Sequence, residues 1–317
     1  MLIRHAAAAI RAQNGCGRDL TPSFRRAPRH AAFSEPASKE PPRMSRWIAG
    51  LPMYNVTPHH GALWRALLDD ALAAFARRGG TREVSVLEEP FGELMPLWRR
   101  ADLLLSQTCG YPFRMLGIAD VARLIATPCF DADGCDGAWY SSVLVVSAAA
   151  QARGATTLAG CRGLRAACNG DDSHSGMNAF RRAVAPLARG ERFFASVTAF
   201  GSHRNALDAL AAGHADCAAI DCVTFAYLRD ALPERLREIR VIGTSAGAPG
   251  LPLIASRRLD DRQAGWLRDA LDVACSADPA RARALRLRGF KTVAEADYDR
   301  IARMADEAAA LGYPRLA

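Results

Sequence analysis

Short apolar runs alternate with amphipathic stretches along the chain from residue 46 onward. Apolar runs bounded by turn-forming residues predict strands, and an apolar residue at every third or fourth position predicts a helix. The predicted strands are 46–54, 83–88, 101–107, 121–128, 139–147, 163–170, 193–200, 215–221 and 239–245, and the predicted helices are 61–80, 93–100, 175–190, 202–213 and 222–232. An extended segment follows at 247–256, and we expect the rest of the chain to be mostly helical. This alternation of strands and helices indicates an α/β fold.

Polar clusters follow four of the predicted strands, at the point where each strand ends. They are Ser106 to Thr108, Asp172 to Ser175, the pair Ser202 and His203, and Asp221. In open α/β sheets, ligands bind outside the carboxyl ends of the strands. We therefore expect these clusters to converge on one ligand site.

The densest cluster is "DDSHSG" at 171–176, which comes directly before a predicted helix. Ser173 or Ser175 can cap that helix by accepting a hydrogen bond from a backbone N–H group. The same helix start also suits an anion, because free N–H groups lie at the positive end of the helix dipole. Two hydroxyls and His174 supply more donors than a cap requires, and the pattern leaves both interpretations open.

A serine hydrolase is a competing hypothesis for the same residues. A nucleophile elbow has glycine two positions before and two positions after the serine. Neither Ser173 nor Ser175 has glycine at these two positions. A triad of Ser175, His203 and Asp221 remains compatible with the order of the residues, because catalytic triads occur in several chain orders.

The other candidate residues also have a structural and a functional interpretation. His203 falls in the first turn of a helix that Ser202 can cap, and Asp221 can cap the helix that follows it. As a ligand group, Asp221 would accept a hydrogen bond from a protonated oxyanion or bind a ligand amine. Tyr54 and Tyr111 follow strands of the first half, where they either anchor loops or form the opposite wall of a cleft.

No metal or cofactor site is expected from the sequence. The acidic segment 131–136 lacks the glycine at position 6 and the glutamate at position 12 of a calcium-binding EF-hand loop. The nine cysteines include no CxxC pair, which argues against a zinc knuckle. Several of them, such as Cys168 and Cys217, lie in apolar runs, as is typical of buried thiols in a reducing compartment. We expect folding to need no disulfide.

The net charge of +8 is concentrated near the N-terminus. Residues 1–43 contain eight basic and three acidic side chains, whereas the remaining 274 residues contain 33 basic and 30 acidic ones. This balance argues against a nucleic-acid-binding protein, which presents a clustered basic face. No run approaches the roughly 18 consecutive apolar residues of a membrane span.

The first 45 residues are basic and aperiodic, which predicts a disordered extension. Their apolar run at 6–10 is shorter than the core of a secretory signal. We expect the functional chain to begin near Met44 and residues 1–43 to add nothing to folding.

Two segments resemble a known family. "DDSHSGMNAF" at 171–180 and "FGSHRNALDALAAGHADCAAID" at 200–221 resemble the substrate-binding proteins of phosphonate ABC importers, and "GYP" at 110–112 and "YSSVLVV" at 140–146 support the likeness. The resemblance covers about residues 46–315. It implies ligand contacts from Tyr54, Tyr111, Ser173, His174, Ser175, His203 and Asp221. The family usually has a small hydroxyl residue at the position of His174.

The resemblance also implies an α/β fold of the type 2 periplasmic-binding-protein class. One lobe would comprise 46–141 and 247–317, and the other 142–246. Crossing segments at 140–146 and 243–253 would join the lobes as two hinges, with the ligand cleft between them.

The implied function is reversible binding of a small oxyanion, such as phosphate, phosphite or phosphonate, without catalysis. The protein would be a monomer that serves an importer, with an ABC permease as its partner, or a sensor. The alternatives are an enzyme that uses Ser175, His203 and Asp221, the effector domain of a regulator, and a binding protein for a thiamine precursor. The compartment stays open, since cysteine usage favours the cytoplasm and the resemblance favours the periplasm.

Overall fold

Two mixed β-sheets organise residues 46–317, which are the residues that the computed structural model describes. The predicted extension at 1–45 lies outside the described residues. In the first sheet the strand order is β14-β4-β13-β3-β1-β2. Its strands are β1 (Trp47–Gly50), β2 (Val84–Val86), β3 (Leu103–Gln107), β4 (Ala122–Phe130), β13 (Leu253–Ser256) and β14 (Leu287–Lys291). β1, β2 and β3 are parallel, whereas β13 runs antiparallel to β3 and β4, and β14 to β4.

The second sheet has the order β11-β7-β10-β8-β9. Its strands are β7 (Ser142–Ser147), β8 (Arg165–Cys168), β9 (Ser196–Ala199), β10 (Cys217–Asp221) and β11 (Ile239–Thr244). β8, β9 and β10 are parallel, and β7 is antiparallel to β10 and β11. The α/β fold class predicted from the sequence is confirmed.

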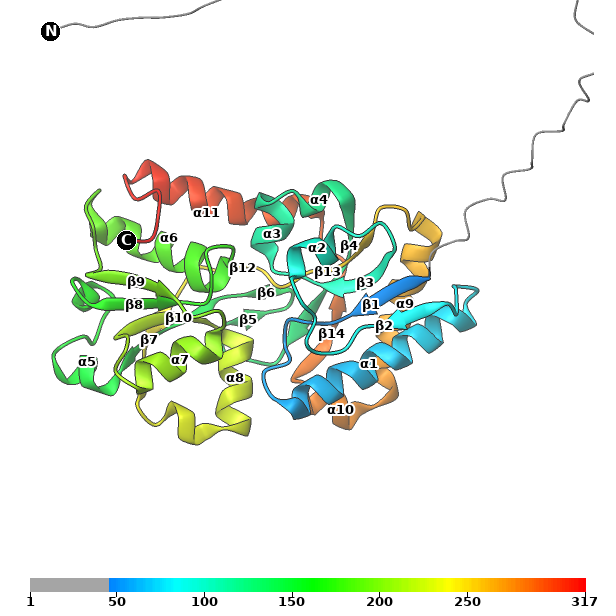
Figure 1. The fold of residues 1–317 in the computed structure, drawn as a ribbon, viewed down its shortest axis with the longest axis horizontal. Coiled ribbons are helices and arrows are strands. Elements are labelled where there is room, and N and C mark those ends of the chain that lie inside the picture. Colours follow the sequence, from blue (N-terminus) through cyan, green and yellow to red (C-terminus); the bar gives the residue numbers. More distant parts are fainter. Residues whose placement is uncertain (1–45) are drawn as a thin grey trace, which may run out of the picture. The chain divides into compact units, whose positions relative to one another are not determined.

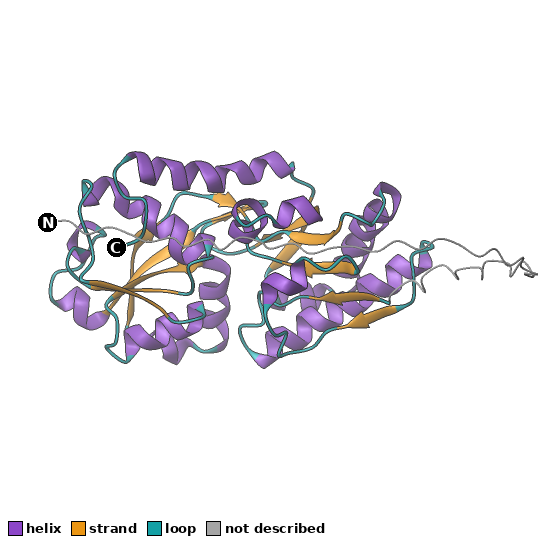
Figure 2. Ribbon diagram, turned by 45° about the horizontal axis from the view of Figure 1, so that its top comes forward, coloured by secondary structure: helices purple, strands orange, loops and turns teal. Residues whose placement is uncertain are grey.

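Helices surround both sheets (Figure 2). They are α1 (Pro58–Arg77), α2 (Leu94–Trp98), α3 (Gly110–Met115), α4 (Ile118–Val121), α5 (Ala148–Ala152), α6 (Ala179–Ala188), α7 (His203–Ala211), α8 (Cys222–Ala231), α9 (Asp261–Ala277), α10 (Pro279–Ala284) and α11 (Asp299–Ala310). The longest, α1, begins at Pro58 after the Thr57 cap and buries Trp64, Leu68 and Phe75 toward the first sheet and α9. This three-to-four-residue spacing is the pattern from which the helix was predicted. Among the described residues, none of these helices has the length and apolar character needed to cross a membrane.

A small third sheet contains both segments in which the chain passes between the two large sheets. Its strands are β5 (Cys135–Asp136), β6 (Trp139–Tyr140) and β12 (Ala248–Pro249), in the order β12-β6-β5. β6 leads into β7 of the second sheet, and β12 follows β11 on the way back to β13. Because β6 and β12 pair with each other, the two passages lie side by side.

Two parts of this arrangement differ from the expected one. The segment Leu287–Lys291, expected to be helical, forms β14 at the edge of the first sheet, where pairing with β4 overrides the helical pattern of its neighbours. Cys135 and Asp136, which lie in none of the predicted strands, form β5 and pair in a hairpin with Trp139 and Tyr140. Both strands are short. The partner of β14, which is β4, lies far from it in sequence, and no apolar pattern marks the hairpin of β5 and β6.

The last helix, α11, packs against α6 beside the second sheet and against α3 beside the first (Figure 1). Beyond it, the carbonyl of Ala317 accepts hydrogen bonds from the backbone N–H groups of Phe193 and Phe194. The end of the chain is therefore attached to the surroundings of the second sheet, although 247–317 was assigned to the first lobe. The residue ranges of the two lobes stay a prediction.

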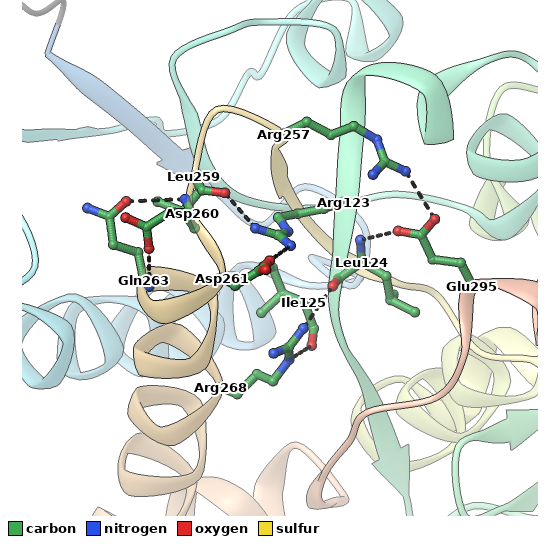
Figure 3. A network of polar contacts seen from close by, with 10 residues as sticks. All are labelled: Arg123, Leu124, Ile125, Arg257, Leu259, Asp260, Asp261, Gln263, Arg268 and Glu295. Carbon is green, nitrogen blue, oxygen red and sulfur yellow. Dashed lines mark hydrogen bonds and ion pairs between the residues drawn. The ribbon is translucent and has the colours of Figure 1, made fainter.

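A cluster of arginines fixes β4 in the first sheet (Figure 3). The pairing of β4 with β13 shifts register between Leu253 and Ile254. Near this irregularity, Arg268 Nε donates to the carbonyl of Ile125 at 2.8 Å, and an ion pair joins Arg123 to Asp261 at the start of α9. The Arg268 side chain thus satisfies a carbonyl group of β4 at the place where the backbone pairing of β4 with β13 is irregular.

Asp216 directly precedes β10, at the end of the strand away from Asp221, and binds two arginines there. Its side chain is almost fully buried and accepts hydrogen bonds from Arg153 Nη2 at 2.9 Å and from Arg165 Nε and Nη2 at 2.9 and 3.0 Å. These hydrogen bonds and the charge of Arg165 lower the pKa of Asp216 from 3.8 to about 2.

We predict that Asp216→Asn lowers the free energy of unfolding at pH 7 by about 1–3 kcal/mol, because charged hydrogen bonds are lost. A carboxyl with a lowered pKa stabilises the fold above its unfolded pKa, so the difference from wild type should vanish as pH falls from about 4 to 2. Denaturant unfolding across this pH range measures it. The control Asp208→Asn removes a more exposed ion pair with Arg235, and a loss as large as that of Asp216→Asn would contradict the prediction.

Candidate functional site

A cavity of about 210 Å³ opens between groups carried by the two large sheets. Residues that follow β1 and β3 of the first sheet line one side, and residues that follow β8, β9 and β10 of the second sheet line the other. The lining residues are Met53, Tyr54, Leu94, Trp98, Cys109, Pro112, Asn169, Asp172, Ser173, Ser175, Gly201, His203, Asp221, Thr224 and Leu251. An adjoining cavity of about 500 Å³ shares Asn169 and His203 and extends past Arg204 and Asp208. Three of the four predicted polar clusters, those after β8, β9 and β10, therefore contribute to the cavity, whereas Ser106 to Thr108 are not part of its lining.

The helix start after β8 is a π-helical turn, η2 (His174–Asn178), which continues into α6. Ser173 is the cap, and its hydroxyl accepts a hydrogen bond from the N–H of Gly176 at 3.0 Å. The hydroxyl of Ser142, at the start of β7, donates to the carbonyl of Ser175 at 2.9 Å and holds the turn against the second sheet. The N–H of His174 donates to the sulfur of Cys109 at 3.3 Å. Since a thiol is a weak acceptor, a ligand oxygen would be a better partner for this group.

Ser175 and His203 lie in direct contact. The Ser175 hydroxyl and His203 Nε2 are 2.8 Å apart, and His203 begins α7 behind its cap Ser202. Burial lowers the pKa of His203 to about 4, so the ring is neutral at physiological pH. Its Nδ1 atom is buried and has no hydrogen-bond partner among the described residues. The neutral ring therefore offers hydrogen bonding rather than a positive charge.

Asp221 joins the two sides of the cavity. Its Oδ1 caps α8 by accepting hydrogen bonds from the N–H groups of Val223 and Thr224 at 2.8 and 3.0 Å. Its Oδ2 accepts a hydrogen bond from the hydroxyl of Tyr54, which follows β1, at 3.1 Å. Burial raises the pKa of Asp221 to about 6, and these three donors oppose that shift. The carboxyl group thus changes its protonation near neutral pH.

The structure brings five of the seven predicted residues to the cavity, namely Tyr54, Ser173, Ser175, His203 and Asp221. His174 is 2% exposed, its ring Nδ1 lies 3.2 Å from the side-chain amide of Asn178, and burial lowers its pKa to about 3. Tyr111 is half-buried on α3. Neither His174 nor Tyr111 belongs to the cavity lining. All seven assignments as ligand contacts stay predictions.

Two further polar groups at this place were missed from the sequence. Asn169 lines the cavity, and its buried Oδ1 has no partner among the described residues. The hydroxyl of Tyr140, at the end of β6, is likewise buried without one, and burial, together with Cys109 and Asp221, raises the pKa of this phenol. The position of Asn169 directly after β8 could have indicated its role. The sequence marked Tyr140 only as part of a strand and a crossing segment, because its place near Asp221 depends on pairing with β12.

A hydrolase triad is not assembled. Ser175 and His203 have the spacing of a nucleophile and its base, but both oxygens of Asp221 are bound to other donors. The Nδ1 atom of His203, which a triad carboxylate would hold, has no partner among the described residues. Without that third group the base is not oriented.

The lining of the 210 Å³ cavity contains Asp172 and Asp221 and, within the described part of the chain, no Lys or Arg. Hydroxyls, amide groups and backbone N–H groups are its donors. No group of three or more His, Cys, Asp or Glu residues within 46–317 is placed to hold a metal ion. The cavity is therefore built for hydrogen bonding to a small polar solute.

Solved structures with a similar fold identify the class. A binding-protein component of an ABC phosphonate transporter from Pseudomonas aeruginosa has a TM-score of 0.64 and 18% identity, covering 82% of this chain and 86% of that one. A protein from Prochlorococcus marinus, solved with methylphosphonate, has a TM-score of 0.62 and 16% identity, covering 82% and 97%. A Xanthomonas citri protein, solved with ATP, has a TM-score of 0.60 and 17% identity, covering 84% and 97%. The fold is that of the type 2 periplasmic binding proteins, as predicted.

The family is identified by sequence. Residues 99–300 match the family described as the periplasmic substrate-binding protein of phosphonate ABC transporters. The chain belongs to this family. Its members are non-catalytic substrate-binding proteins, so the prediction that the protein is not an enzyme is confirmed. No curated protein matches the chain.

Gly176 permits the close packing of the site. A Cβ at this position would lie 1.9 Å from Asn169 Oδ1 and 3.1 Å from His203 Cε1. We predict that Gly176→Ala displaces the Asn169 side chain and lowers the free energy of unfolding by about 1–3 kcal/mol, the usual range for overpacking. Thermal or denaturant unfolding measures this.

The matched control is Gly265→Ala in α9, where nothing lies within 4 Å of the added methyl group. It should raise stability by roughly 0.5–1 kcal/mol, because alanine favours a helix interior over glycine. Equal stability changes in the two variants would contradict the steric argument.

Proposed function

We propose that this protein reversibly binds a small phosphorus oxyanion in the cavity between Tyr54 and the η2 turn. The main observation behind this proposal is that several hydrogen-bonding groups converge on one small cavity. The cavity lining contains Ser175, His203 and the helix start capped by Ser173. It also contains the carboxyl group of Asp221, which can take up a proton near pH 6. An oxyanion needs such directed donors, and each charge-assisted hydrogen bond contributes about 1.5–3 kcal/mol.

Asp221 provides the basis for choosing among oxyanions. A carboxylate beside a fully ionised anion is repulsive, whereas a monoprotonated phosphate or phosphonate can donate its hydrogen to the carboxylate. With no Lys or Arg in the lining of the described cavity, the carboxylate is not neutralised by a basic side chain. The arrangement therefore favours a ligand that carries an acidic proton.

The neighbouring structures support the proposed ligand class. The Prochlorococcus marinus protein was solved with methylphosphonate, which makes methylphosphonate, phosphate and phosphite the first compounds to test. The Xanthomonas citri protein was solved with ATP, and ATP is therefore the comparison ligand of a different size. In an importer the loaded protein would act as a monomer that delivers its solute to an ABC permease.

We predict that one of these small oxyanions stabilises the protein by about 2.7 kcal/mol at a hundredfold excess over its dissociation constant. This corresponds to a rise in melting temperature of roughly 5–10 °C. Ser175→Ala should weaken binding by about 1.5–3 kcal/mol, because a hydroxyl donor to a charged ligand is lost. Isothermal titration calorimetry measures the affinity.

The control for this prediction is Ser276→Ala, which removes an exposed hydroxyl on α9 and should leave the affinity unchanged. If phosphate, phosphite and methylphosphonate produce neither heat nor a shift in melting temperature, the helix start is a structural cap and the proposed ligand class is wrong.

We further predict that Asp221→Asn reverses its effect on methylphosphonate binding with pH. At a pH between the Asp221 pKa of about 6 and the second ionisation of the ligand, the variant should bind more weakly, because the acidic ligand proton loses its carboxylate acceptor. At a pH well above both that ionisation and the Asp221 pKa of about 6, the variant should bind more tightly, because repulsion between two negative groups is removed.

Calorimetry at both pH values tests this reversal. Asp171→Asn is the matched control, because Asp171 is exposed and lies outside the cavity lining, so its loss should change affinity little at either pH. An Asp221→Asn effect of the same sign at both pH values would contradict the assigned role.

A further inference from the structure

Two thiols that are far apart in sequence meet beside the cleft. The Sγ atoms of Cys135 and Cys222 are 3.5 Å apart, although 87 positions separate the residues. Cys135 is the first residue of β5 in the small sheet, and Cys222 is the first residue of α8. Both are free thiols in the structure.

The backbone holds these two residues together without help from the thiols. Gly134 has φ +95°, a conformation that suits glycine, and a Cβ there would lie 3.2 Å from Cys222 Cβ. The hydroxyl of Ser141 donates to the carbonyl of Gly134 at 3.1 Å, and the N–H of Cys222 donates to the carbonyl of Ser141 at 3.3 Å. The hairpin is thereby fixed against the start of α8.

The two thiols differ in access. Cys135 is half-buried and Cys222 is 1% exposed, so Cys135 is the more accessible of the two. The hydrogen bond with Cys135, burial and the nearby Asp221 raise the pKa of the Cys222 thiol. Attack on an oxidant therefore starts at Cys135, and Cys222 is placed to resolve the product.

We propose that Cys135 and Cys222 are a dithiol–disulfide modification site, oxidised by a small disulfide such as oxidised glutathione. The Cys135 thiolate attacks one sulfur of the oxidant, forms a mixed disulfide and releases one small thiolate. Cys222 then gives up its proton and attacks the sulfur of Cys135, and the second small thiolate leaves and takes up a proton. Two protein thiols and one small disulfide thus become one protein disulfide and two small thiols.

The location gives this bond a consequence for the cleft. Cys222 directly follows Asp221, and Cys135 pairs across the hairpin with Tyr140. A disulfide would tie the helix capped by Asp221 to the hairpin that leads from the first large sheet into the second. The inference holds whichever solute the cleft binds, because it rests on the two thiols and their backbone supports.

Another pair, Cys161 and Cys217, provides the comparison. These residues are 0% and 1% exposed within the core beneath α5 and α6, so neither can be reached by an oxidant in the folded protein. Access, rather than proximity alone, distinguishes Cys135 and Cys222.

The test treats the reduced full-length protein with excess oxidised glutathione, followed by intact mass measurement and peptide mapping. We expect a product lighter by two hydrogen atoms, with Cys135 linked to Cys222. Cys222→Ser should instead retain one glutathione on Cys135, because the resolving thiol is absent. Cys135→Ser should form neither product, and Cys161→Ser should behave as wild type.

The melting temperature provides a second measurement. The disulfide closes a long loop and restricts the unfolded chain, so oxidation should raise the melting temperature by several degrees, reversibly on reduction, and should not do so in Cys135→Ser. Wild-type protein that forms no disulfide, or that links any other pair of cysteines, would overturn the proposal.

Discussion

The carboxyl group of Asp221 is buried at the end of β10, and the cleft depends on how it is satisfied. Isolated burial would be expensive, and burial accordingly raises its pKa to about 6. Two backbone N–H groups of α8 and the hydroxyl of Tyr54 offset this cost by donating to its two oxygens. Asp221 therefore fixes the start of α8, beside the second sheet. It also contacts Tyr54, which follows β1 of the first sheet. A change in its protonation acts on both.

The sequence predicted the parts of the structure that depend on local pattern. The strands that carry the site were expected close to where β3, β8 and β10 lie, and the polar groups after β8 and β10 do converge. The caps formed by Ser173, Ser202 and Asp221 were also recognised, since each precedes an amphipathic run. The ligand contacts assigned to these residues by resemblance stay predictions.

The missed features depend on contacts between distant segments. β14 forms because an edge of β4 is available to it, and Tyr140 lies near Cys109 and Asp221 because β6 pairs with β12. The neutral state of His203 follows from burial, which lowers its pKa to about 4, whereas its position in the sequence suggested only a helix start. Neither a long-range pairing nor the depth of a side chain is encoded in a local pattern of apolar residues.

In the proposed binding mode, structural caps and ligand groups are not alternatives, because the same groups already have partners within the protein. The hydroxyl of Ser175 contacts His203, the N–H of His174 donates to the sulfur of Cys109, and Tyr54 donates to Asp221. A solute must therefore exchange existing hydrogen bonds for its own, and each contact contributes the difference between the two. That difference is largest where the internal acceptor is weakest. In that binding mode the η2 turn, whose N–H group meets a thiol, would contribute more to binding than Tyr54, whose hydroxyl already donates to a carboxyl group.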